Sequence, residues 1–137
     1  MSAPEGYIEV THGKLTVNVP RKLFSGADAT LDEAKAAEFG RMLKSRYPWL
    51  TDGSLEVLFR NARFEMLRVL DYETGGRNES KRLEEQGDIE GAIKHLKKHL
   101  EEDPEDADSW YALGNLLCKA GRTDEGYQAF NKGRSLF

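Results

Sequence analysis

The chain has 137 residues, enough for one ordinary domain or for two small modules that share a core. Hydrophobic residues make up 39% and charged residues 32% of the sequence, which excludes a disordered chain and is typical of a soluble, helix-rich protein. The net charge of −4 argues against a dedicated nucleic-acid-binding protein, which usually carries an excess of basic residues.

Cysteine content and the hydropathy pattern indicate the cellular compartment. Cys118 is the single cysteine, which excludes an intramolecular disulfide and a cysteine-based zinc cage. The first residues, MSAPEGYIEV, lack the basic and apolar regions of a secretory signal. No apolar run approaches the roughly 20 residues that span a bilayer. The sequence therefore predicts a cytoplasmic protein without membrane association.

Residues 7–20 alternate apolar and polar side chains on both sides of a turn signal at His12 and Gly13. This pattern predicts a β-hairpin that ends at Pro20, which has no N–H to donate to a sheet. An isolated hairpin is marginally stable in water, so we expect it to pack against another part of the chain. Residues 21–30 are predicted to be a connector.

Two helices are predicted after this connector. The first begins near Asp32, with Thr30 as its N-cap, and ends before Pro48. The second covers residues 54–72 and ends at the two glycines of the ETGG segment, residues 73–76. Its apolar residues form a wide surface, which predicts a helix that is covered on more than one side.

The C-terminal part of the sequence contains an internal repeat. A shift of 34 residues, the spacing between Gly87 and Gly121, brings similar residues into line. The aligned pairs are Leu83 and Leu117, Gly87 and Gly121, Asp88 and Arg122, Glu90 and Asp124, Ala92 and Gly126, Leu96 and Phe130, and Lys98 and Lys132. A 34-residue period of paired helices is the signature of the tetratricopeptide repeat.

Residues 107–137 resemble this family at its characteristic positions. These are Trp110, Leu113, Gly114 and Leu117 on the first helix, Gly121 in the turn, Phe130 on the second helix, and a proline, Pro104, at the junction before the repeat. Residues 77–106 resemble a degenerate first copy, because Gly76, Glu79 and His99 replace the residue types that the family carries there.

The resemblance implies a mainly α fold. We expect tetratricopeptide-like helical hairpins over residues 77–137, packed on an N-terminal element of a β-hairpin and two helices over residues 1–76. Glycine in a helix costs roughly 1 kcal/mol relative to alanine. Gly114, Gly126 and Gly133 are therefore predicted to be packing residues that let two helices approach closely.

The chemistry-bearing residues predict no catalytic site. One cysteine and three histidines assemble no nucleophile and base, so we expect no enzyme activity and no cofactor. His95 and His99 have the i, i+4 spacing of a metal site, but two ligands are incomplete and the neighbouring Lys97 and Lys98 repel a cation. No metal site is predicted.

The resemblance also implies a concave groove, lined by the first helix of each repeat, that holds an extended peptide or a partner helix. Carried over position by position, the predicted peptide-binding residues are Arg77, Lys81, Tyr111, Asn115 and Lys119. Asn115 matches the position where some family members hold a peptide backbone or a terminal carboxylate. The sequence therefore predicts a non-enzymatic adaptor or scaffold with a protein or peptide partner.

A second hypothesis is structural self-assembly. Leu136 and Phe137 lie at an apolar end of the last predicted helix, where a capping helix is absent from this sequence. Such an edge invites self-association, so the alternative is a homodimer formed through the C-terminal helical edge.

Nucleic-acid binding through the middle helices is a third and weaker hypothesis. These helices carry the basic residues Arg41, Lys44, Arg46, Arg60, Arg63 and Arg68. Acidic residues lie between them, which favours ordinary solvated helix faces, and the acidic net charge makes a nucleic-acid partner an unfavoured interpretation.

Overall fold

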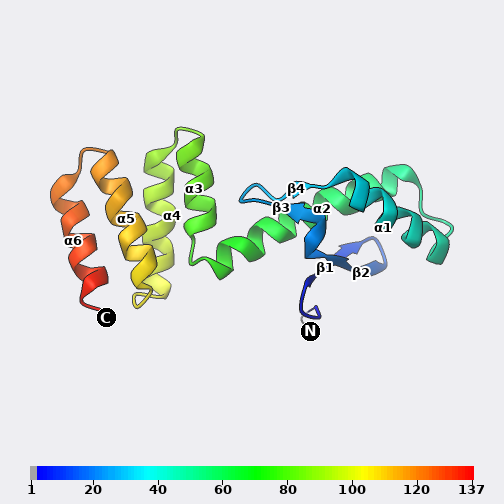
Figure 1. Cartoon of the computed structure of the whole chain (residues 1–137), viewed down its shortest axis with the longest axis horizontal. Helices are drawn as coiled ribbons and strands as arrows, with labels where there is room; N and C mark the ends of the chain where they lie inside the picture. The colour runs from blue at the N-terminus through cyan, green and yellow to red at the C-terminus, as the bar shows by residue number, and fades with distance from the viewer. Residues whose placement is uncertain (1–2) are drawn as a thin grey trace. The chain divides into compact units, whose positions relative to one another are not determined.

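The computed structural model describes residues 3–137. This part of the chain contains six α-helices and two short two-stranded sheets (Figure 1). The chain divides into two compact units, Met1–Val69 and Leu70–Phe137. The expected fold class, mainly α with an N-terminal β-hairpin and tetratricopeptide-like helices at the C-terminus, is confirmed.

The predicted hairpin is present in the first unit. Strands β1 (Tyr7–His12) and β2 (Leu15–Pro20) pair antiparallel, and the turn between them contains Gly13 at a φ of 62°. Cross-strand pairs place the alternating apolar residues on one face, which is buried. These residues are Ile8, Val10, Leu15, Val17 and Val19.

The connector after the hairpin contains more structure than the sequence indicates. Arg21–Leu23 form a 3₁₀ turn, η1, and β3 (Phe24–Ser25) pairs with β4 (Thr30–Leu31). The backbone N–H of Asp32 donates to the Leu23 carbonyl at 2.7 Å, which closes this segment. The connector is thus a small second sheet.

Helices α1 (Glu33–Arg46) and α2 (Asp52–Glu73) follow. The predicted Thr30 cap is wrong, because Thr30 lies in β4; the Asp32 carboxylate instead accepts from the backbone N–H of Lys35 at 3.1 Å. Helix α2 starts two residues earlier than Ser54, and the Thr51 hydroxyl accepts from the Ser54 N–H at 3.0 Å.

Small residues on α1 bring it close to α2. A Cβ on Gly40 would lie 3.3 Å from Leu55 Cδ1, and the Phe39 and Phe59 rings are 6.4 Å apart. The buried side of α2 is formed by Leu55, Leu58, Ala62, Met66 and Leu67. The expectation of a helix covered on more than one side is wrong at Phe64, which is 59% exposed.

The second unit consists of two helical hairpins. Helices α3 (Arg77–Glu85) and α4 (Ile89–Glu102) form the first, and α5 (Ala107–Lys119) and α6 (Thr123–Arg134) form the second (Figure 1). The turn within each hairpin contains a glycine in the left-handed conformation: Gly87, at a φ of 85°, in the first hairpin and Gly121, at a φ of 80°, in the second. The core consists of Ala92, Ile93, Leu96, Leu100, Leu113, Leu116, Leu117 and Ala129.

The helical glycines of the second hairpin are packing residues, as predicted. A Cβ on Gly114 would lie 2.6 Å from the Phe130 ring and 3.0 Å from the Gly126 carbonyl oxygen. A Cβ on Gly126 would lie 2.5 Å from Cys118 Sγ, and one on Gly133 would lie 3.2 Å from the Ala107 carbonyl oxygen. Close contact between α5 and α6 therefore requires these residues to lack side chains.

Candidate functional site

A groove opens between α3 and α5, the first helices of the two hairpins. Its volume is about 240 Å³, and it is called the α3–α5 groove below. Its lining consists of Arg77, Ser80, Lys81 and Glu84 from α3, and Ala112, Asn115, Leu116 and Lys119 from α5. Four of the five predicted peptide-binding residues, Arg77, Lys81, Asn115 and Lys119, thus lie around one groove.

The helical period explains this convergence. Arg77, Lys81 and Glu84 follow one another at intervals of four and three on α3, so they share a face. Ala112, Asn115 and Lys119 do the same on α5. These two faces form the opposite walls of the α3–α5 groove.

Arg77 is fixed at one end of the groove by its neighbours. One of its guanidinium nitrogens lies 3.3 Å from Asp106 Oδ1 and 3.2 Å from Ser109 Oγ. Burial alone would raise the pKa of Asp106, but hydrogen bonds from Ser109 and His99 and the charge of Arg77 outweigh it and lower that pKa. Arg77 therefore provides a positive charge in a set position.

The other cations of the groove differ in their availability. Lys119 forms an ion pair with Glu84 across the groove. Lys81 forms no ion pair with any residue that the structure describes. The exposed amide of Asn115 lies on the same lining. Because Arg77 is paired with Asp106 and Lys119 with Glu84, the unpaired positive charge of the groove is that of Lys81.

Tyr111, the fifth predicted residue, is not part of the groove lining. Its ring packs between Phe130, at a centroid distance of 6.3 Å, and Phe137, at 6.1 Å with nearly parallel planes. Phe130 lies on α6 and Phe137 lies three residues after its end, and these contacts direct the Tyr111 ring toward α6. In the sequence, the signal for this contact was the interval of seven residues between the two phenylalanines.

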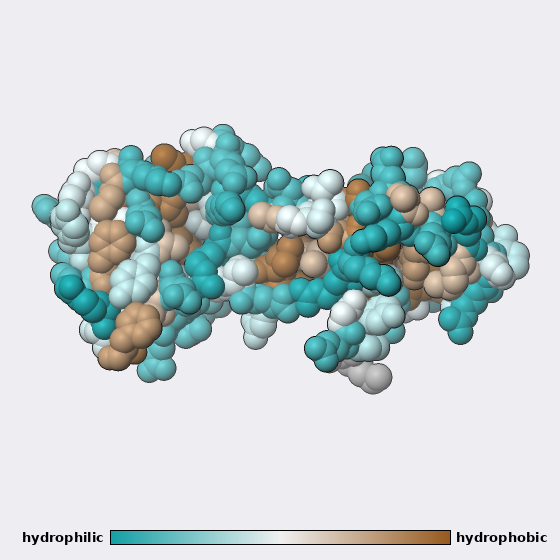
Figure 2. All heavy atoms as spheres, in the orientation of Figure 1, coloured by the Kyte–Doolittle hydropathy of each residue, from teal (hydrophilic) through white to brown (hydrophobic). Residues whose placement is uncertain are grey.

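Tyr111 belongs to an aromatic row on α5, α6 and the residues after α6, formed by Tyr127, Phe130, Tyr111 and Phe137. Phe137 is 86% exposed and Tyr127 is 58% exposed, whereas Leu136 is half-buried. Hydrophobic residues are visible on the surface over α5 and α6 in Figure 2. The two residues assigned to self-association, Leu136 and Phe137, lie at the end of this row.

The histidines of α4 bind two different carboxylates. His95 Nε2 lies 2.7 Å from Asp71 Oδ2, and His99 Nε2 lies 3.1 Å from Asp106 Oδ2. The hydrogen bond to Asp71 raises the pKa of His95 despite its partial burial. The two rings therefore do not converge on one ion, and their role in the structure is to join α4 to Asp71 and Asp106.

One group of metal-ligand type occurs in the described residues, and sequence reasoning missed it. Ligand atoms of His99, Asp103 and Asp106 lie within 4.8 Å of one another. Asp106 already accepts hydrogen bonds from Ser109 and Arg77, and the positive charge of Arg77 opposes a cation beside it. The donor set fits a structural hydrogen-bond network better than a metal centre.

Three of the six basic residues considered for nucleic-acid binding on the middle helices are bonded within the protein. Lys44 pairs with Asp52, Arg68 pairs with Glu65, and the Arg63 guanidinium donates to the Asp28 carbonyl oxygen at 3.1 Å. These bonds support the interpretation of ordinary helix faces over a nucleic-acid interface.

Comparison with known families adds one match. The tetratricopeptide repeat model matches residues 83–135, which begin inside α3 and extend into the residue after α6. The chain has no match among curated proteins or solved structures. Residues 83–135 thus form a segment of the tetratricopeptide repeat family, whose members are protein–protein interaction modules and generally non-catalytic.

The resemblance seen in the sequence is confirmed for this segment. The match covers less than half of the chain, and it includes Asn115 and Lys119 but neither Arg77 nor Lys81. Within residues 3–137, no helix has both the length and the apolar composition needed to cross a membrane.

Proposed function

We propose that this protein is a cytoplasmic, non-enzymatic adaptor or scaffold that holds an extended peptide in the α3–α5 groove. The observation that carries the proposal is the convergence of Arg77, Lys81 and Asn115 around one groove on the first helices of two repeats. The peptide carries a carboxylate, from an acidic side chain or from its C-terminus.

The available side chains determine how the peptide is held. Arg77 is bonded to Asp106 and Lys119 to Glu84, so Lys81 is the cation most accessible to an incoming carboxylate. The Asn115 amide both donates and accepts, which suits a peptide backbone. Leu116, which is 5% exposed, contributes an apolar floor. We expect micromolar affinity, which is typical of transient contacts and corresponds to about 8 kcal/mol of binding free energy.

The test uses two labelled synthetic peptides of extended sequence that differ only in a central glutamate or glutamine. Fluorescence anisotropy with the full chain gives each dissociation constant. We expect the glutamate peptide to bind about tenfold more tightly, a difference of about 1.4 kcal/mol, because a charge-assisted bond forms with Lys81. Lys81→Glu should abolish this preference, and Asn115→Ala should weaken both peptides.

Lys94→Glu on the exposed side of α4 is the matched control, since it makes the same charge change outside the groove. It should leave the preference intact. A glutamate preference that persists in Lys81→Glu contradicts the proposed site, and failure of both peptides to bind contradicts the proposed function.

A second candidate function is homodimerisation through the aromatic row, favoured by the exposure of Phe137 stacked on Tyr111. Light scattering after size exclusion tests it with a Leu136→Glu/Phe137→Glu double variant. A dimeric wild type and a monomeric variant support assembly through this edge. If both are monomeric, this candidate is rejected.

A further inference from the structure

The aromatic row adjoins the α3–α5 groove on the surface of α5. Tyr111 lies one helical turn before Asn115, which lines the groove, and at 3.6 residues per turn the two residues are about 40° apart around the helix axis. Residues at this spacing are neighbours on a helix surface. The Tyr111 side chain therefore leaves α5 beside the groove, on the side that faces Phe130 of α6.

The internal repeat relates the groove and the row to each other. A shift of 34 residues places Arg77 on Tyr111 and Lys81 on Asn115. The same two positions thus carry two cations on α3 and an aromatic ring and an amide on α5. A peptide that crosses from the first repeat to the second passes from positive charge to an aromatic surface.

The aromatic row is accessible to a partner. Phe137 is 86% exposed and stacks on Tyr111 with 20° between the ring planes. Tyr127, at the other end of the row, is 58% exposed and lies 6.3 Å from Phe130. Apolar residues reach the surface over α5 and α6 in Figure 2. Contiguous exposed apolar surface of this kind is typical of an interaction site.

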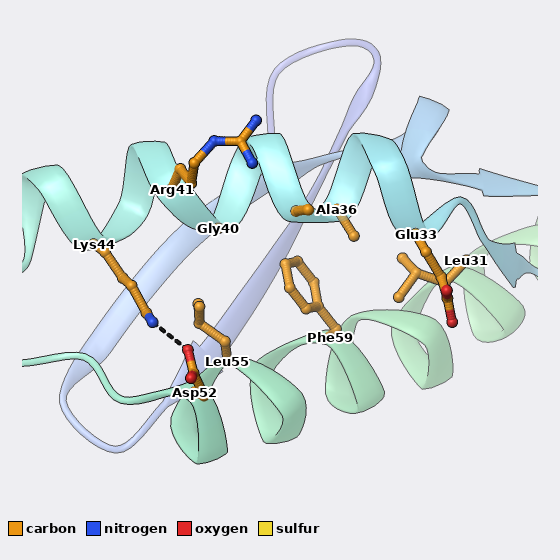
Figure 3. A pocket seen from close by; sticks show the side chains of 10 residues that line it. Leu31, Glu33, Ala36, Gly40, Arg41, Lys44, Asp52, Leu55 and Phe59 are labelled. Atoms are coloured by element: carbon orange, nitrogen blue, oxygen red, sulfur yellow. Dashed lines mark hydrogen bonds and ion pairs between the residues drawn. The ribbon is translucent and has the colours of Figure 1, made fainter.

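The groove between α1 and α2 in the first unit offers no comparable surface. Figure 3 shows Leu55 and Phe59 extending from α2 toward α1. Leu55 is buried, as are Ala36 and Gly40 on the facing side of α1, and a Cβ on Gly40 would lie 3.3 Å from Leu55 Cδ1. These apolar residues pack against one another and leave no apolar surface for a partner.

We propose that the peptide held in the α3–α5 groove also places an aromatic side chain on Tyr111 and Phe137. This inference rests on the proposed function, and it adds a second determinant of specificity to the carboxylate that binds Lys81. The occupant of the exposed rings is the same peptide, because the row continues the groove along α5 within one helical turn of Asn115.

The arrangement of the helices sets the spacing of the two peptide residues. Lys81 and Tyr111 lie on neighbouring helices, and Tyr111 is one turn nearer the helix start than the position equivalent to Lys81. With packed helices about 8–10 Å apart and a helical pitch of about 5.4 Å, the two sites are roughly 10 Å apart. In an extended polyproline II chain, residues three positions apart share a face and are about 9 Å apart. The partner therefore has an acidic and an aromatic residue three positions apart.

The test uses four labelled peptides, which combine a central glutamate or glutamine with phenylalanine or serine three residues away on both sides. Substitution on both sides makes the result independent of the direction in which the peptide binds. Fluorescence anisotropy with the full chain should show about fivefold or tighter binding of the phenylalanine peptides, because the added ring loses contact with water against two rings of the protein. The preference for glutamate should remain.

Two substitutions locate the aromatic contact. Phe137→Ser removes an exposed ring, so folding tolerates it, and it should remove most of the gain from phenylalanine. Tyr72→Ser is the matched control, because Tyr72 is also 86% exposed, and it should leave the gain unchanged. Tyr111→Ser should abolish the gain and keep the glutamate preference, whereas Tyr111→Phe should keep both.

The outcomes separate this inference from the proposed function. Equal binding of the phenylalanine and serine peptides, with the glutamate preference intact, overturns the inference and leaves the proposed function standing. A gain that persists in both Phe137→Ser and Tyr111→Ser also overturns it, because the peptide ring is then bound elsewhere. So does concentration-dependent self-association that Phe137→Ser abolishes, because a second copy of this chain then covers the row. If wild type binds none of the four peptides, the proposed function fails, and this inference fails with it.

Discussion

Gly114 packs directly against Phe130: a Cβ added to the glycine would lie 2.6 Å from two carbons of the aromatic ring. The Gly126 carbonyl oxygen, at 3.0 Å, closes the same space from the backbone of α6. Neither neighbour can withdraw without moving α6 away from α5. The glycine therefore fixes the separation of the two helices of the second repeat.

We predict that Gly114→Ala destabilises the second unit by up to about 2 kcal/mol, since overpacking costs about 1–3 kcal/mol and alanine gains roughly 1 kcal/mol in helix propensity. Urea unfolding measures this effect in a Trp49→Phe background, where Trp110 alone reports on residues 70–137. An unchanged or higher unfolding midpoint would show that Phe130 can repack and would contradict the tight contact.

Gly40→Ala should have the opposite effect. Its Cβ would meet only Leu55 Cδ1 at 3.3 Å and the Phe59 ring at 4.0 Å, and Leu55 Cδ1 is the tip of a flexible side chain. A shift of a few tenths of an ångström accommodates it, so the gain in helix propensity should stabilise the first unit by up to about 1 kcal/mol.

Trp49 in a Trp110→Phe background reports on this unit. Gly53→Ala is the matched control for Gly40→Ala, because the nearest atom to its Cβ is Thr51 Oγ1 at an ordinary 3.8 Å. A clear loss of stability for Gly40→Ala, with no loss for Gly53→Ala, would mean that Leu55 is held rigidly.

These two glycines show how far sequence reasoning extends. Gly114 could be identified because the 34-residue period places it at a family position, so its packing role followed from the helical resemblance. Gly40 carries no such signal, and only the structure shows that α1 and α2 approach there. The hairpin was also predictable, because strand alternation is a local property of the sequence.

The polar partners of the repeat were not predictable in the same way. Asp71 lies 24 residues from His95, and Asp106 lies 29 residues from Arg77, so each pair depends on how separate helices pack. Tyr111 illustrates the same limit within the candidate site. Its position on α5 follows from the helical period, but its contact with Phe130 and Phe137 depends on the path of α6.

The His95–Asp71 pair should make the stability of the second unit depend on pH. The hydrogen bond and charge of Asp71 raise the pKa of His95 above 6.5, with Glu79 adding to this effect and Lys98 opposing it. Burial raises the pKa of Asp71, but His95 and the Glu79 backbone N–H lower it below 3.8 overall. Both groups are then charged between these values.

The stabilisation from His95 is complete below pH 6.5 and is lost as the pH rises through its raised pKa; that from Asp71 is present above pH 3.8 and is lost as the pH falls through its lowered pKa. We predict that His95→Gln lowers the free energy of unfolding by about 1 kcal/mol between about pH 4 and 6.5, and by less at pH 9.

Urea unfolding followed by Trp110 fluorescence at several pH values measures this difference. His12→Gln is the control, because His12 lies in strand β1 of the first unit. A difference between wild type and His95→Gln that stays constant from pH 5 to pH 9 would show that the charge on His95 contributes nothing.

The Ser109 side chain lies on α5, in the second repeat, but we expect it to contribute mainly to the stability of the first repeat. The side chain is fully buried, and its hydroxyl lies 2.9 Å from both the Gly75 carbonyl oxygen and Asp106 Oδ2. It also accepts from Arg77 at 3.2 Å. It thus joins the start of α5 to the turn before α3 and to the first residue of α3.

Helix α3 needs such bonds because it buries little apolar surface. Ser80 is its one buried residue, where the family places a small side chain, and no large apolar residue of α3 is buried. Its anchors are polar: Arg77 bonds Asp106, the Glu79 N–H donates to Asp71 Oδ1 at 3.0 Å, and Ser80 Oγ lies 3.4 Å from the Ala92 carbonyl oxygen. The first helix of the degenerate repeat is thus held by hydrogen bonds together with the partly buried Leu83, whereas its second helix, α4, supplies core residues.

Ser109→Ala leaves the buried Gly75 carbonyl without this donor and removes one of the acceptors of the Arg77 guanidinium. We expect a loss of about 1–3 kcal/mol and faster amide hydrogen exchange across residues 77–85. Ser135→Ala removes an exposed hydroxyl that donates to the Lys132 carbonyl oxygen at 2.7 Å, and it should change stability by less than about 0.5 kcal/mol. Equal effects of the two substitutions, or unchanged exchange in α3, would show that the α3–α4 packing alone holds the first repeat.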